Sequence, residues 1–150
     1  MYPTILARFP VVEQFAKFVL IGAMNTLVDL GVLNVLMFSS GFSEGIYYSF
    51  FKAVSFTVAV ILSYNLNKRW TFNDVSDEDR AKKFTQFLTV SIVGAIINIS
   101  VATAVVTYVK PMVDVAFLTS QLWGNIGALS GTAIGLVWNF LGYKFIVFKK

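Results

Sequence analysis

The stretch SYNLNKRWTF (63–72) combines amide, basic and aromatic side chains directly after a long apolar run. An arginine fork binds phosphate oxygens through two parallel hydrogen bonds, and amide groups can share that role. Asn65 and Arg69 are four residues apart, which places them on one face of a helix. The alternative interpretation is simple anchoring at a membrane–water interface, where Trp, Lys and Arg are common. The candidate phosphate-binding residues in this stretch are Asn65, Asn67, Lys68, Arg69 and Trp70.

A similar cluster, VWNFLGYKFIVF (137–148), lies near the end of the chain. It adds Asn139 and Lys144 to the candidate phosphate-binding residues. Leu141 and Gly142 stand where the first cluster has Asn67 and Lys68, so we expect a weaker contribution from the second cluster. The matched pairs are Tyr64-Asn65 with Trp138-Asn139 and, after one inserted residue, Arg69-Trp70 with Lys144-Phe145.

Three polar residues lie inside apolar runs and form a predicted polar groove: Asn25, Asp29 and Asn98. A carboxylate in a membrane span costs a few kcal/mol unless it has a partner or a wet cavity. Lys52 could pair with Asp29, or its ammonium could reach the outer interface. For the two amides, hydrogen bonding between helices is the favoured alternative.

The composition determines the elements that must position these side chains. The chain is 57% hydrophobic and 13% charged, whereas soluble domains have roughly 25% charged residues. The sequence therefore predicts an all-α integral membrane protein. A spanning helix needs roughly 20 mainly apolar residues, and four segments qualify: 17–38, 47–67, 85–109 and 115–141.

Several functions are excluded by the residues that are missing. The chain has no histidine and no cysteine, which removes the commonest general base and metal ligand and all thiolate chemistry. We therefore expect no enzyme activity and no cofactor. The basic residues fall at the predicted membrane edges, which argues against nucleic-acid binding.

The spans predict a single membrane domain made of two helical-hairpin repeats, at about 14–72 and 83–148, around a charged loop at 68–83. Two spans per repeat return the chain to the same side, so the repeats are parallel. Of the 12 Lys and Arg residues, only Lys110 and Lys52 fall on the opposite side. The positive-inside rule then places both termini and the loop in the cytoplasm.

Two local features carry further predictions. Ser76 followed by Asp79 resembles a capping box at the start of the third span. The small residues Gly124, Ala128, Gly131 and Gly135 form one helical stripe, which we interpret as a packing face within the bundle or between protomers.

The stretches FAKFVLIGAMNTLVDLGVLNVLM (15–37), YNLNKRWTFN (64–73) and GYKFIVFKK (142–150) resemble the GtrA-like family. The resemblance covers about residues 14–148 and implies a small four-helix membrane protein of cell-surface polysaccharide synthesis. Such proteins are proposed to flip polyprenyl-phosphate-linked sugars, together with a polyprenyl-phosphate glycosyltransferase. By the resemblance, the family motif falls on Asn65, Asn67, Arg69 and Trp70, and its polar position in the first span falls on Asn25.

We therefore expect flipping of a polyprenyl-phosphate-linked sugar from the cytoplasmic to the outer leaflet of the plasma membrane. Four helices leave little room for a closed aqueous path, which favours a homodimer or a groove open to lipid. The main alternative is a non-transporting subunit that recruits or stabilises a glycosyltransferase. A proton-coupled exporter of cations, using Asp29, is a third possibility, but the basic clusters would repel its substrates.

Overall fold

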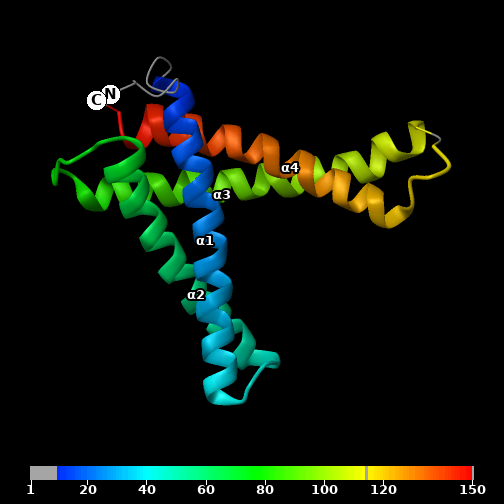
Figure 1. The fold of residues 1–150 in the computed structure, drawn as a ribbon, viewed down its shortest axis with the longest axis horizontal. Coiled ribbons are helices and arrows are strands. Elements are labelled where there is room, and N and C mark those ends of the chain that lie inside the picture. The colour runs from blue at the N-terminus through cyan, green and yellow to red at the C-terminus, as the bar shows by residue number, and fades with distance from the viewer. Residues whose placement is uncertain (1–9, 114, 150) are drawn as a thin grey trace, which may run out of the picture. The chain divides into compact units, whose positions relative to one another are not determined.

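A computed structural model of the chain describes residues 10–113 and 115–149. Every regular element in these two ranges is a helix. The described residues contain four helices long and apolar enough to cross a membrane: Pro10–Ser40, Ile46–Thr71, Arg80–Met112 and Leu122–Val147 (Figure 1). The predicted all-α membrane fold with four spans is confirmed, and the chain is a multi-pass membrane protein.

The described residues fall into two compact units, 10–78 and 79–149, and the boundary lies inside the charged loop. Each unit contains one of the two predicted helical hairpins. Their equivalence as repeats, and the cytoplasmic position of the termini, stay predictions.

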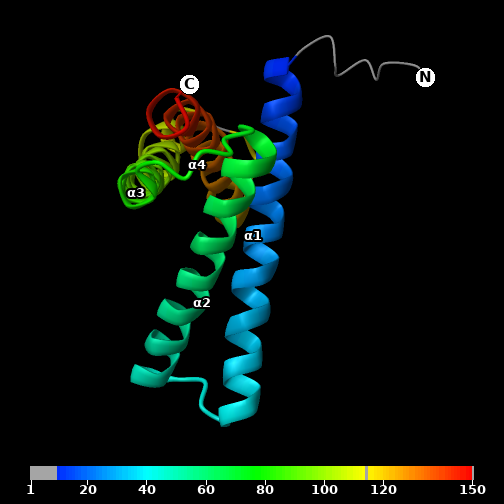
Figure 2. The same cartoon turned by 90° about the vertical axis from the view of Figure 1, so that its left-hand side faces the viewer.

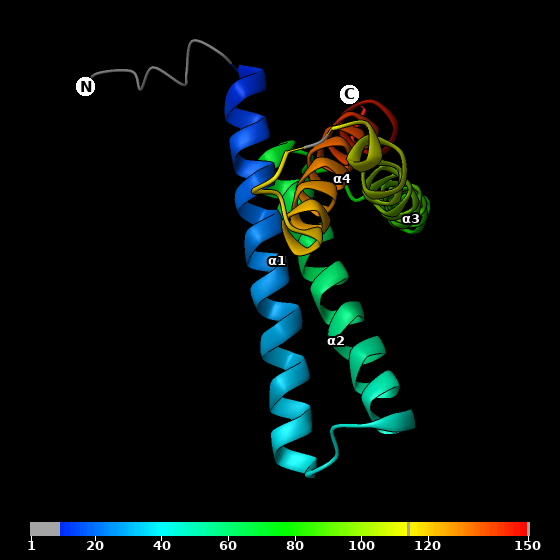
Figure 3. The same cartoon turned by 90° about the vertical axis from the view of Figure 1, so that its right-hand side faces the viewer.

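The first unit is a pair of long helices, α1 (Pro10–Ser40) and α2 (Gly45–Leu66), which lie side by side (Figure 2). α1 ends where Gly41 adopts a φ of +76° and donates its amide to the carbonyl of Met37 at 2.9 Å. Only glycine adopts this left-handed conformation at little cost, and it satisfies one of the last carbonyls of the helix. The short connection that follows leads directly into α2 (Figure 3).

The second unit repeats this plan with more irregular helix ends. Thr119 caps α4 (Ser120–Gly142) by accepting the amide of Leu122 at 3.2 Å on its hydroxyl. The long helices α3 (Arg80–Ala104) and α4 run along each other for most of their length. The elements of the second unit are α3 (Arg80–Ala104), η3 (Val105–Val109), η4 (Lys110–Met112), α4 (Ser120–Gly142) and η5 (Tyr143–Val147).

The structure moves three of the predicted helix starts. α1 is already helical at Pro10, ahead of the predicted span at 17–38. α4 begins at Ser120 and not at residue 115, because Thr119 provides the cap. α3 begins at Arg80, where Asp79 has a φ of +53° and makes no side-chain cap. The predicted capping box at Ser76 is therefore wrong.

The glycines of α4 that pack against α3 also lie on a different face of the helix from the predicted stripe. An added Cβ would meet α3 at Gly127, Gly131 and Gly135, whereas it would meet nothing within 4 Å at Gly124. The Cβ of Gly131 would fall on the backbone carbonyl of Asn98. The close contact between these helices therefore requires a glycine every fourth residue. The predicted stripe was right about helix packing, but Gly124 and Ala128 are exposed and do not belong to that contact.

Candidate functional site

The end of α2 is a π-helix, η2 (Asn67–Thr71), which the sequence did not predict. The amide of Phe72 donates to the carbonyl of Asn67 at 3.0 Å and closes the wide turn. Asn67 donates its side-chain amide to the carbonyl of Ser63 at 2.9 Å and accepts the hydroxyl of Thr71 at 3.1 Å. Asn67 is 1% exposed and Thr71 fully buried. The carboxamide of Asn67 therefore holds the helix end in place, with its polar atoms already bonded inside the protein.

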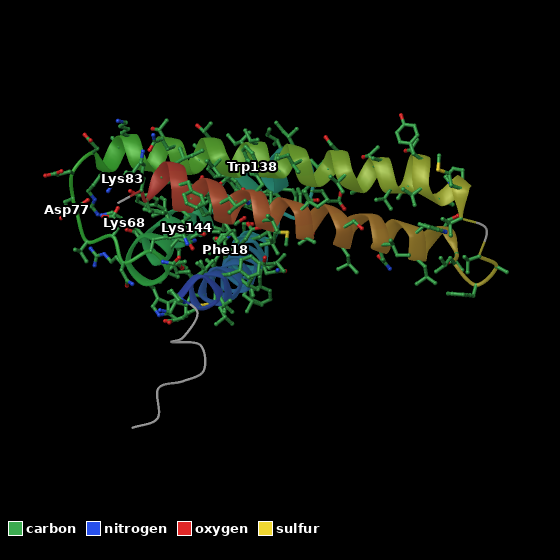
Figure 4. All side chains as sticks on the ribbon, turned by 90° about the horizontal axis from the view of Figure 1, so that it is seen from above. Phe18, Lys68, Asp77, Lys83, Trp138 and Lys144 are labelled. Atoms are coloured by element: carbon green, nitrogen blue, oxygen red, sulfur yellow. The ribbon has the colours of Figure 1, made fainter. Side chains whose placement is uncertain are left out.

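Lys68 is enclosed by the loop that follows it. Its ammonium donates to the carbonyl of Ser76 and lies 3.7 Å from the carboxylate of Asp77 (Figure 4). The loop folds back because Asp74 donates its amide to the carbonyl of Lys68 at 2.8 Å and accepts the amide of Ser76 at 3.0 Å. The Lys68 side chain is only 3% exposed. A buried ammonium requires such partners, so the acidic loop has a role that sequence reasoning missed.

Arg69 differs from Lys68 in both exposure and bonding. Its side chain is exposed, and within the described part of the chain its guanidinium has no hydrogen bond or ion pair. Trp70 is 42% exposed, and the ammonium of Lys17 lies 5.8 Å from its ring centroid. Asn65 is half-buried and donates its amide to the carbonyl of Ile61 at 2.8 Å. Arg69 is therefore the cation of this cluster that is ready to bind an anion.

The second unit ends in the same way, with the π-helix η5 closed by the amide of Phe148 on the carbonyl of Tyr143 at 2.8 Å. Tyr143 occupies the position that Asn67 has in η2. It bonds the hydroxyl of Ser91 at 2.6 Å and stacks on Phe87 with 4.3 Å between ring centroids. The first residue of each π-helix thus fixes it to surrounding structure.

The π-helix register makes Lys144 the counterpart of Lys68, because each is the second residue of its π-helix. Among the residues that the structure describes, no loop encloses Lys144. Its ammonium lies 5.8 Å from the ring centroids of Phe140 and Phe145. Asn139 lies over Gly94 on α3, and its side-chain oxygen is buried without a hydrogen-bond donor. Asn139 and Lys144 belong to the second unit, and the other candidate residues of the phosphate group belong to the first.

The predicted groove residues have three different environments. The carboxylate of Asp29 forms an ion pair with the ammonium of Lys52 and accepts a hydrogen bond of 2.7 Å from the hydroxyl of Ser55. The pairing of Lys52 with Asp29, one of two alternatives from the sequence, is the one present. Asn25, one helical turn away on α1, has a buried side-chain oxygen that accepts no hydrogen bond from the described residues. Asn98 belongs to the second unit.

Asn98 lies in the contact between α3 and α4. It donates its amide to the hydroxyl of Thr132 at 3.4 Å, and its Cβ would be 3.4 Å from a Cβ added at Gly135. This is the helix–helix role that the sequence offered as the alternative for the amides. Ser55, fully buried beside Asp29, had no signal in the sequence beyond its position three residues after Lys52.

The GtrA/DPMS transmembrane domain family matches residues 17–148. The chain belongs to this family. It is 27% identical over 139 residues to the uncharacterized membrane protein YngA of Bacillus subtilis (strain 168), covering 91% of this chain and 80% of that protein. No solved structure matches the chain significantly.

Membership of the GtrA/DPMS family indicates a membrane function related to polyprenyl-phosphate-linked sugars. The matched region contains the π-helices η2 and η5 and every candidate residue of the two predicted sites. The resemblance noted from the sequence is thereby confirmed at the level of the family.

Proposed function

We propose that the protein binds a polyprenyl-phosphate-linked sugar at the end of α2 and moves it from the cytoplasmic to the outer leaflet of the plasma membrane. The observation that carries this proposal is the exposed guanidinium of Arg69, which has no partner in the described residues and stands on a rigid helix end. A planar guanidinium suits bidentate binding of a phosphate.

The surroundings of Arg69 support phosphate capture. Asn67 and Thr71 hold the π-helix from inside, and Lys68 ties it to the loop that follows. A preformed site loses little entropy on binding. In this arrangement Arg69 contacts the phosphate, whereas Asn67 and Lys68 act as positioning residues.

The sugar would cross along polar groups within the spans. Asn25 offers a buried oxygen without a donor, one turn from the Asp29–Lys52 pair. A sugar hydroxyl could donate to that oxygen and remove an unsatisfied polar atom. A groove open to lipid, or shared by two copies in a homodimer, leaves the polyprenyl chain in the membrane. The chain carries no ATP-binding motif, so we propose downhill transport drawn by consumption of the lipid-linked sugar outside.

The experiment that tests this proposal is a leaflet-resolved transport assay in proteoliposomes with labelled polyprenyl-phosphate sugar. A charged hydrogen bond contributes about 1.5–3 kcal/mol, so Arg69→Ala should slow translocation roughly 10- to 100-fold. Arg69→Lys, which keeps the charge and loses the fork, should fall between. The control is Arg80→Ala, an exposed arginine at the start of α3. Unchanged transport by folded Arg69→Ala protein would refute the phosphate contact.

A second candidate is a non-transporting subunit that recruits or stabilises a polyprenyl-phosphate glycosyltransferase. It is favoured by the description of the matched family, which names DPMS beside GtrA. This candidate predicts that the purified protein moves no lipid-linked sugar, yet co-purifies with a glycosyltransferase and changes its activity. The same proteoliposome assay, run with and without the enzyme, separates the two functions.

A further inference from the structure

The second unit contains a basic pocket that lies outside the site described above. It has a volume of about 280 Å³ and opens between the start of α3 and the end of η5. Three lysines converge on it, two from α3 and one that follows η5. Its lining residues are Asp79, Lys82, Lys83, Gln86, Ile146, Val147 and Lys149.

An apolar pocket of about 230 Å³ adjoins the basic pocket, and the two share Gln86 and Ile146. One wall is the ring of Trp138, whose indole N–H donates to the carbonyl of Val90 at 3.1 Å and so fixes the ring across the two helices. In Figure 4, Lys83 lies near the start of α3 and Trp138 farther along the hairpin. The remaining lining residues are Thr85, Thr89, Val90 and Val93.

The two pockets together have the chemical pattern of a phospholipid-like amphiphile. Lysines attract anionic head groups at a membrane surface, each contributing about 1 kcal/mol. The apolar pocket continues from Gln86 toward the middle of the span, the direction that a hydrocarbon chain takes from its head group. A head group in the lysine pocket would therefore place the start of its chain beside Trp138.

We propose that this double pocket binds a polyprenyl phosphate without its sugar. Three lysines beside one aspartate leave a surplus of positive charge. A phosphate monoester, which carries about −1.5 to −2 charges at neutral pH, suits this surplus better than the singly charged diester of a lipid-linked sugar. The inference rests on the proposed function, because that function supplies the polyprenyl class of the lipid.

The test is binding of polyprenyl monophosphate to the full-length protein in nanodiscs of neutral lipid. Lys82→Gln and Lys149→Gln should each weaken binding about fivefold. The matched control is Lys110→Gln, which removes the same charge at the opposite end of the unit and should leave the affinity unchanged. Thr89→Phe fills the apolar pocket from an exposed position without changing any charge, and should also weaken binding.

A second measurement locates the chain. The protein has three tryptophans, so Trp70→Phe/Trp123→Phe leaves Trp138 as the only one. A polyprenyl phosphate brominated near its head group should quench Trp138 fluorescence, and Thr89→Phe should abolish the quenching. If this double variant does not fold, brominated lipid that quenches wild type but not Trp138→Phe gives the same information.

Three results would overturn the inference: equal competition by phosphatidylglycerol, full competition by inorganic phosphate, or binding that none of the variants weakens. Arg69→Ala separates this inference from the proposed function. That variant should lose transport of the lipid-linked sugar and keep its affinity for polyprenyl monophosphate. If Arg69→Ala leaves transport unchanged, the phosphate contact at Arg69 fails, while the binding results still decide the double pocket.

Discussion

Asp29 and Lys52 form an ion pair within the membrane spans of the first unit, joined by the hydroxyl of Ser55. An isolated charge in this environment costs several kcal/mol, and each member of the pair therefore depends on the other. The pair links α1 to α2. It therefore stabilises helix packing and also lowers the free-energy cost of placing each charge within the spans. Its polar surroundings include the unsatisfied oxygen of Asn25, one turn away.

Asp29→Asn should lower the free energy of unfolding because the ammonium of Lys52 loses its carboxylate. Removal of one member of a fully buried pair costs about 3–5 kcal/mol, and we expect about 2 kcal/mol here because the Lys52 side chain is 42% exposed. Unfolding in mixed micelles measures the change. The double variant Asp29→Asn/Lys52→Gln should recover at least half of the loss, and a double variant no more stable than the single one would contradict this account.

At the scale of elements, the second long helix of each unit ends in a five-residue π-helix closed by a phenylalanine amide. π-turns are rare and often occur at functional sites. In η2 the turn depends on a hydrogen bond between two fully buried side chains, Asn67 and Thr71. The position of Arg69, within the same turn, therefore depends on this hydrogen bond.

Thr71→Val should destabilise the first unit because the side-chain oxygen of Asn67 loses its buried donor. An unsatisfied buried acceptor costs about 1–3 kcal/mol. Thr71→Ser keeps the hydroxyl and loses one methyl group, which costs about 0.8 kcal/mol. Thermal unfolding of the two variants checks the order. A serine variant less stable than the valine variant would show that shape, and not the hydrogen bond, stabilises the turn.

The α3–α4 contact gives a matched pair of glycine variants. In Gly131→Ala the new methyl group would meet the backbone carbonyl of Asn98, which cannot rotate away. Overpacking of this kind costs about 1–3 kcal/mol. In Gly124→Ala the methyl group meets nothing within 4 Å, so the variant should gain up to about 1 kcal/mol from helix propensity. The free energies of unfolding of the two variants, measured side by side, decide whether Gly131 and not Gly124 faces α3.

At the scale of the whole molecule, the positive charges predict that the termini and the 68–83 loop face the cytoplasm. The chain has no cysteine, so single cysteines can report on its orientation. Val75, in the loop, and Met112, between the third and fourth spans, are 87% and 82% exposed.

In intact cells a membrane-impermeant maleimide should label Met112→Cys and leave Val75→Cys unlabelled. Val75→Cys should become reactive only after the cells are opened, because its loop lies inside. Labelling is read as a mass shift of the purified protein. The opposite pattern would place the proposed phosphate site at the outer leaflet and would reverse the direction of the proposed transport.

The sequence predicted those parts of the fold that depend on hydropathy, since four apolar runs of spanning length are sufficient to place four helices. It also placed Arg69, Asn67 and Lys68 in one cluster. It could not distinguish their states, because the burial of Lys68 depends on a loop that folds back through Asp74 and Ser76. It could not determine which face of α4 packs against α3 either, because small residues lie on more than one face of that helix.

The π-helix at the end of α2 also changes how this stretch responds to deletions. A π-turn contains one residue more than an α-turn, so loss of one codon within 67–71 would leave a backbone that can continue as a regular α-helix. Because the π-turn absorbs the extra residue, the side chains before and after the turn would keep nearly the same directions. A one-codon deletion here should therefore disturb the fold less than the same deletion within α2, where it would rotate every following side chain by about 100° around the helix.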